Sequence, residues 1–244
     1  MIGLTSVTFR ALDAGDIIAL CARTGVRGIE WGGDVHVPPD DIANAAVVER
    51  QTRAAGLRVL SYGSYYRLNT GGQFAPVLRA AQALGAPRVR IWAGERGSAQ
   101  ADGDYGDAAA AELRDICAQA APAGITVALE YHRNTLTDTA DSALALLQAA
   151  GSGNLRTYWQ PNPDLTLEQQ LGELRLLGEW VDAVHVFQWQ RGNLRCQLEE
   201  GEAAWQTYLE LLGQHRDYIL EFVRDDAPEQ FRRDAATLAR WLGR

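Results

Sequence analysis

The sequence predicts a single α/β domain over residues 1–244, built as a (β/α)8 barrel (the TIM-barrel fold) with eight parallel strands. The chain has 244 residues, and this fold typically needs about 250. Four segments, at 21–31, 52–62, 81–92 and 118–131, share one rhythm, in which a helical tail leads through a glycine into a short β-rich run. Those runs are apolar on both faces, which is typical of parallel strands that helices cover.

The same rhythm continues more loosely through the rest of the chain. We expect strands near residues 2–7, 27–31, 57–62, 87–92, 125–131, 155–160, 182–187 and 217–223. We expect helices within 12–24, 38–55, 70–84, 107–121, 138–150, 166–180, 202–215 and 226–242.

Residues that favour helix starts support several of these boundaries. Asp13 precedes the first helix, Asp40 lies near the start of the second, and Thr166 with Gln169 fits a capping box for the sixth. Eight β-then-α units without a linker favour a closed barrel. The alternative is an open doubly wound sheet, but its GxGxxG fingerprint is missing from the first turn at 5–13.

Composition excludes several classes of function. All 23 basic residues are arginine, and without lysine the chain can form neither a Schiff base nor a P-loop. The net charge of −8 argues against nucleic acid as a partner. The odd, widely spaced Cys21, Cys117 and Cys196 indicate free thiols. We find no signal peptide and no apolar run of membrane-spanning length, so we expect a cytoplasmic protein without membrane attachment.

Four polar residues stand at the ends of otherwise apolar strands. Glu130, Gln160, His185 and Glu221 fall on the fifth to eighth strands, one on each. In a barrel these ends converge on one site, and a buried carboxylate there needs a cation or an ion-pair partner. Oxygen ligands with one imidazole suit Mn²⁺ or Mg²⁺, and Co²⁺ or Zn²⁺ also fit. A structural alternative remains for each residue alone, since a glutamate can pair with an arginine and a histidine can be hydrogen-bonded in the core.

From GLTSVTF through GIEWGGD, ALEYH, VHVF and ILEFV, the chain resembles the xylose-isomerase-like TIM-barrel superfamily, whose members are usually labelled sugar phosphate isomerase/epimerase. The resemblance implies that Glu130, Gln160, His185 and Glu221 bind one divalent metal ion. The family pattern has Asp where this chain has Gln160, so the ligand charge falls from −3 to −2 and we expect weaker metal binding. The pattern also often places a histidine where this chain has Pro163.

Further side chains are candidates for substrate contact. Arg191 lies six residues after His185, where ketose epimerases of the superfamily carry an arginine, although a solvated loop arginine is equally consistent. Strand alternation and loop position add five more candidates: Glu30, His36, His132, Trp92 and Trp159.

The resemblance implies proton transfer beside a carbonyl, through a metal-stabilised enediolate, with Glu130 and Glu221 removing and returning the proton. We therefore predict a sugar isomerase or epimerase acting on a small sugar-like molecule. The substrate is expected to lack phosphate, because no glycine-rich phosphate loop follows the last two strands.

Three other functions stay open. One is a metal-assisted lyase or dehydratase acting on an oxidised sugar or glycoside. Another is a non-catalytic sugar-binding barrel, which Gln160 keeps open. A DNA-repair nuclease of the same superfamily is disfavoured by four histidines and the acidic charge. Relatives are often dimers or tetramers, so a homo-oligomer is also an expectation.

Overall fold

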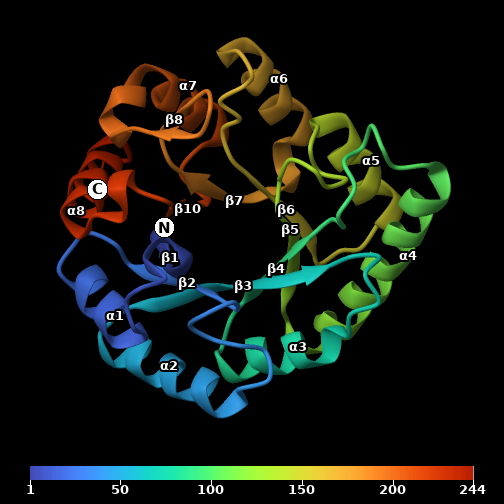
Figure 1. Cartoon of the computed structure of the whole chain (residues 1–244), viewed down its shortest axis with the longest axis horizontal. Helices are drawn as coiled ribbons and strands as arrows, with labels where there is room; N and C mark the ends of the chain where they lie inside the picture. Colours follow the sequence, from blue (N-terminus) through green and yellow to red (C-terminus); the bar gives the residue numbers. More distant parts are fainter. Residues whose placement is uncertain (244) are drawn as a thin grey trace.

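The computed structural model describes residues 1–243, in which eight parallel strands close into a barrel inside a ring of eight α-helices (Figure 1). Neighbouring strands follow the order β1-β10-β7-β6-β5-β4-β3-β2, so the last barrel strand pairs with the first. The barrel strands are β1 (Ile2–Thr5), β2 (Gly28–Gly32), β3 (Arg58–Arg67), β4 (Arg88–Trp92), β5 (Thr126–Leu129), β6 (Leu155–Trp159), β7 (Val181–Val186) and β10 (Asp217–Leu220). The predicted fold and all eight predicted strands are confirmed.

Helices alternate with the strands as the sequence predicts. They are α1 (Ala14–Ala22), α2 (Ile42–Ala54), α3 (Phe74–Ala83), α4 (Gly103–Ala120), α5 (Ala140–Ala150), α6 (Leu167–Leu177), α7 (Glu202–Leu212) and α8 (Pro228–Trp241). Within residues 1–243, no helix has the length and apolar character needed to cross a membrane.

Side-chain caps explain where several helices begin. Asp13 caps α1, and Thr166 forms the expected capping box with Gln169 at the start of α6. The cap of α2 is Asp41, one residue after the expected Asp40, because its Oδ1 accepts from the Asn44 backbone N–H at 2.9 Å. The capping residues in the sequence therefore predict where these helices start to within one residue.

One pair of strands was not expected from the sequence. Between β7 and α7 the chain forms a short antiparallel hairpin of β8 (Trp189–Gln190) and β9 (Leu194–Arg195). Only two residues pair on each side, too few for the alternation that marks a longer strand. This hairpin follows the strand that carries His185, so it extends over the end of the barrel where the predicted site lies.

The core has two parts. The larger apolar cluster fills the space between the strands and the helices. A smaller one, made of Leu60, Ala128, Tyr158, Ala183 and Ile219, lies apart from it. Gly28 leaves room for Leu60, since a Cβ there would lie 2.6 Å from the Leu60 Cγ.

Ion pairs close the end of the barrel at which the strands start. Arg88 is buried, and its guanidinium lies 2.7 Å from Asp182 and 3.1 Å from Asp217. The Met1 ammonium lies 2.9 Å from Asp217 as well. The opposite end, where the strands finish, is the open one.

Candidate active site

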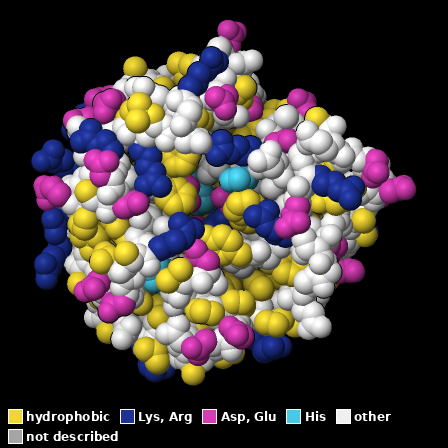
Figure 2. Space-filling view, viewed as in Figure 1, with side chains coloured by type: hydrophobic (Ala, Val, Ile, Leu, Met, Phe, Trp, Pro, Cys, Tyr) yellow, Lys and Arg dark blue, Asp and Glu magenta, His cyan; other side chains and the backbone are white. Residues whose placement is uncertain are grey.

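A cavity of about 380 Å³ opens at the C-terminal ends of the barrel strands. Figure 2 shows the hollow near the centre of this face, with histidine side chains in cyan and arginine side chains in dark blue around it. Glu130, Gln160 and Glu221 line the cavity, and Glu130 and Glu221 are almost completely buried. The cavity therefore lies where active sites of this architecture are found.

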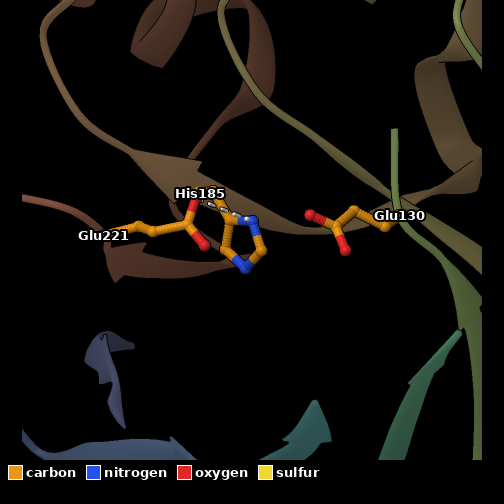
Figure 3. A group of neighbouring side chains, drawn as sticks. All are labelled: Glu130, His185 and Glu221. Atoms are coloured by element: carbon orange, nitrogen blue, oxygen red, sulfur yellow. Dashed lines mark ion pairs between the residues drawn. The ribbon is translucent and has the colours of Figure 1, made fainter. Parts of the chain in front are cut away.

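The four residues predicted as metal ligands lie together. Glu130 follows β5, Gln160 follows β6, His185 lies in β7 and Glu221 follows β10. Potential ligand atoms of Glu130, His185 and Glu221 lie within 4.8 Å of one another, and in Figure 3 the side chains of both glutamates extend toward the His185 ring between them. The Nδ1 atom of His185 is 3.2 Å from Gln160 Oε1 and 3.5 Å from Glu221 Oε2.

The chemistry of these donors fits a divalent cation. Carboxylate and amide oxygens only accept hydrogen bonds, so Gln160 and Glu221 present lone pairs beside His185 Nδ1, and Glu130 brings a further carboxylate oxygen to the same group. Buried acceptors gathered in this way need a positive charge between them. Two carboxylates, one amide oxygen and one imidazole form a mostly oxygen donor set, of the kind that Mn²⁺ and Mg²⁺ accept.

Glu30, a predicted substrate contact, instead lies fully buried beside the site and outside the cavity lining. It accepts from Tyr158 Oη at 2.6 Å and from Ser61 Oγ. Its other oxygen lies 3.2 Å from Arg90 Nε and 3.2 Å from His185 Nε2. Burial by itself would raise the pKa of Glu30, but Arg90 and His185 hold the pKa well below its usual range, so the carboxylate stays charged.

Arg90 is the main site residue that the sequence analysis missed. This β4 side chain is buried, and its guanidinium contacts both Glu30 and Glu130. Gly63 makes room for it, because a Cβ there would lie 2.7 Å from Arg90 Nη2. Arg90 thus places one positive charge between two of the three glutamates that surround the site.

Aromatic side chains form two walls of the cavity. On one side the guanidinium of Arg67 lies 3.8 Å from the Trp92 ring centroid, and the His132 ring is 4.3 Å from Trp92. Both Trp92 and His132 line the cavity, as expected from the sequence. Burial lowers the pKa of His132 to about 4, so its ring is neutral at pH 7. On the other side the ring of Trp189, from the hairpin, lies tilted against the Phe222 ring, with centroids 5.9 Å apart.

Three other predicted substrate contacts lie outside the cavity lining. Trp159 is fully buried on the side of β6 that faces the helices, 5.1 Å from the Tyr208 ring, because strand alternation turns it away from the barrel interior. His36 is buried in the segment between β2 and α2, and its Nε2 lies 3.1 Å from the Leu12 carbonyl oxygen. Arg191 is exposed in the hairpin turn and donates to the Asp164 carbonyl at 3.2 Å.

Two further arginines that the sequence analysis did not single out lie at the cavity mouth. Arg10 lies 2.7 Å from Asp34 and donates to Tyr65 Oη at 2.7 Å. Arg133 is exposed and donates to the side chain of Asn193 at 3.2 Å. Both line the cavity, as do Asp138 and Asp164, and Arg10 is ion-paired with Asp34, so Arg133 is the cavity arginine whose side-chain partner is uncharged.

Comparisons with known proteins identify the family to which this barrel belongs. A model of the xylose isomerase-like TIM barrel family matches residues 18–241. A 3-dehydroshikimate dehydratase from Bacillus anthracis is 26% identical over 201 residues, which cover 75% of this chain and 69% of the relative.

Solved structures share the fold. The probable 3-DHS dehydratase AsbF from Bacillus anthracis superimposes with a TM-score of 0.83 at 19% identity, with 98% of each chain covered. The 3-keto-D-glucoside 4-epimerase from E. coli superimposes with a TM-score of 0.73 at 16% identity, again with 98% of each chain covered. The family model spans almost the whole barrel, and the chain therefore belongs to the xylose isomerase-like TIM barrel family.

Proposed function

We propose that this chain is a divalent-metal-dependent enzyme that transfers a proton at the carbon beside a carbonyl group, as an isomerase or epimerase of a small sugar or related hydroxy-carbonyl compound. One observation carries the proposal: Glu130, His185 and Glu221 present ligand atoms within 4.8 Å of one another beside a cavity of about 380 Å³. A cavity of this size suits a small molecule.

Glu130, Gln160, His185 and Glu221 would hold the metal ion, and Mn²⁺ or Mg²⁺ suits their oxygen-rich set. When bound, the ion supplies a Lewis acid that polarises a carbonyl oxygen. The flat faces of Trp92 and Trp189 offer surfaces for the C–H faces of a sugar ring.

The two glutamates are not equivalent as bases. Arg90 donates to Glu130 Oε2, so one oxygen of this carboxylate is engaged. Glu221 lies 3.5 Å from His185 and faces the cavity. We therefore assign proton removal to Glu221, with Glu130 returning the proton in an epimerase or isomerase.

That asymmetry favours a second candidate, a dehydratase. Elimination of water from a β-hydroxy carbonyl compound needs one base, which takes the proton beside the carbonyl and passes it to the departing hydroxyl, and Glu221, whose carboxylate does not accept from Arg90 as Glu130 does, suits that role. The 26% identity with a 3-dehydroshikimate dehydratase supports this reading. Arg10 and Arg133 at the mouth would suit a substrate with a carboxylate.

One experiment tests both candidates. The purified protein, loaded with Mn²⁺, is incubated in deuterated water with ketoses, keto-sugars and 3-dehydroshikimate. Deuterium on carbon in a recovered isomer supports the isomerase or epimerase. Loss of water with a new ultraviolet-absorbing conjugated product supports the dehydratase.

The Glu221→Gln variant is the control, since it should abolish either signal. Ligand binding without a metal requirement, and without deuterium exchange from any of these compounds, contradicts both enzymes and leaves a sugar-binding barrel.

A further inference from the structure

Both ring nitrogens of His185 have close partners, and the partners differ in kind. Nδ1 faces the metal-ligand side, 3.2 Å from Gln160 Oε1 and 3.5 Å from Glu221 Oε2. Nε2 faces the other way, 3.2 Å from Glu30 Oε1. The ring is fully buried, so water does not supply alternative partners.

All four contacts of the Glu30 carboxylate come from groups that can donate. Arg90 Nε and His185 Nε2 face Oε1, while Tyr158 Oη and Ser61 Oγ face Oε2. A charged carboxylate only accepts hydrogen bonds, so its contact with His185 requires the proton on Nε2. A neutral ring that carries its proton there has its lone pair on Nδ1.

We propose that Glu30 is a positioning residue that holds His185 in the Nε2–H form and directs the Nδ1 lone pair at the metal. Histidines that bind metals usually donate their other N–H to a carboxylate or carbonyl group, which fixes the tautomer and the ring orientation. Glu30 does this from β2, across the barrel from β7, without lining the cavity. The inference rests on the proposed metal site.

The surroundings keep Glu30 and His185 in place. Arg90 contacts both Glu30 and Glu130, so the carboxylate that positions the histidine is tied to a predicted ligand. The Tyr158 ring lies 4.9 Å from the His185 ring and limits its rotation. Tyr158 also donates to Glu30 at 2.6 Å, which fixes the carboxylate from its far oxygen.

Glu30 also compensates for the negative charge that Gln160 does not bring to the metal site. Gln160 brings no negative charge where the family pattern has Asp. A carboxylate hydrogen-bonded to the far nitrogen raises the basicity of an imidazole ligand. The network around Glu30 therefore strengthens the His185 ligand in a chain whose strand-six ligand is neutral.

The test compares two substitutions of Glu30 with one substitution of Ser61, which also contacts the Glu30 carboxylate. Glu30→Ala removes the acceptor. Glu30→Gln keeps an amide oxygen for His185 and Arg90 and turns its NH2 toward the Ser61 and Tyr158 hydroxyls, which can accept. Ser61→Ala removes one buried hydrogen bond to Glu30 but leaves the contact with His185.

The tautomer of the neutral ring is measured first without metal, by nitrogen NMR of ¹⁵N-histidine-labelled protein, with the pH raised until the ring signals no longer change. A His185→Asn sample assigns the signal among the four histidines. We expect the proton on Nε2 in the wild type, Glu30→Gln and Ser61→Ala, and a mixture of tautomers in Glu30→Ala. Titration with Mn²⁺ alone should then show affinity about 10–100-fold weaker in Glu30→Ala, with a smaller loss in Glu30→Gln.

Two results would overturn the inference: a wild-type His185 with its proton on Nδ1, or a folded Glu30→Ala variant with unchanged tautomer and unchanged Mn²⁺ affinity. If Glu30→Ala does not fold, the wild type and Glu30→Gln decide, because both must carry the proton on Nε2. Failure of the wild type to bind Mn²⁺ would instead count against the proposed function, since the tautomer is read without metal.

Discussion

Arg90 on β4 donates to Glu130 at the end of the neighbouring β5, so a predicted metal ligand is also one half of a buried ion pair. The guanidinium holds Glu130 in place and reduces the negative charge that gathers around the cavity floor. A metal ion at this site would therefore join a charge network that the protein already builds.

Replacement of Arg90 by Met should strongly destabilise the metal-free protein. Two buried carboxylates, Glu30 and Glu130, would lose their cation, and breaking a buried pair in this way costs about 3–5 kcal/mol. Mn²⁺ should restore part of the lost stability by supplying positive charge. Urea unfolding with and without Mn²⁺ measures both effects.

Arg88→Met is the matched control. Arg88 is also buried between two carboxylates, but those lie at the opposite end of the barrel. This variant should be destabilised without any special response to Mn²⁺. Equal rescue of both variants would contradict a cation site next to Arg90.

Replacement of Glu221 by Gln should remove the base that we assign to proton removal. Loss of a positioned acid-base group lowers rates by about 10²–10⁴-fold, and deuterium exchange measures the change. Glu173→Gln is the control, because Glu173 is a partly buried carboxylate that does not itself line the cavity and contacts it only through Tyr131. An equal rate loss in both variants would point to general damage.

Gln160→Glu tests the neutral ligand directly. The change keeps the side-chain length, and Gln160 Oε1 already lies 3.2 Å from His185 Nδ1. One added negative charge should tighten Mn²⁺ binding, by about tenfold if the gain is ~1.4 kcal/mol. Calorimetric titration of wild type and variant compares the affinities, and unchanged or weaker binding would place residue 160 outside the ligand set.

Arg133→Met distinguishes acidic from neutral substrates. Arg133 lines the cavity mouth and pairs with an uncharged partner, Asn193, so its charge is available to a substrate carboxylate. KM for an acidic substrate should rise about tenfold, the effect of losing one charged hydrogen bond of ~1.5 kcal/mol, with little change for a neutral sugar. Arg156→Met, at the start of β6, controls for the loss of charge. A uniform rise for both substrate types would argue against recognition of a carboxylate.

The stability of the fold should depend on the protonation of Asp234 in α8. Burial raises the pKa of Asp234 to about 6 from an ordinary value of 3.8. Because the folded-state pKa is the higher one, the contribution is fully present below pH 3.8 and is lost as the pH rises through about 6. The loss amounts to about 3 kcal/mol.

Asp234→Asn keeps an oxygen for the Leu198 N–H and cannot ionise. The difference in unfolding free energy between wild type and this variant should therefore fall between about pH 4 and pH 7. A difference that stays constant over this range would show that Asp234 does not titrate in the fold.

Much of the architecture could be predicted because it depends on local pattern. Runs such as GIEW and TVALEY predict strands, because they are mostly apolar, and each contains one glutamate near its end. The same reasoning brought Glu130, Gln160, His185 and Glu221 to one place. Ligands at strand ends are predictable because the barrel makes those ends converge.

What the sequence analysis missed depends on which way a side chain points. Arg88 and Arg90 are two residues apart on β4, so both side chains enter the barrel. The same spacing is visible in RVRIW, but it can equally mark the polar face of an exposed strand. Trp159 shares a strand with Gln160 but points at the helices. The place of Glu30 beside His185 depends on barrel closure, since the two residues are far apart in sequence.

The pairing of β1 with β10 has a consequence for biosynthesis. Glu221 directly follows β10, and the Phe222 N–H is bound by the hydroxyl of Thr8, just after β1. The chain emerges from the ribosome with β1 first, and β10, which Glu221 follows, is the last barrel strand to appear. A nascent chain therefore brings all four predicted ligands together only after β10 has been made, and β10 then closes the barrel against β1.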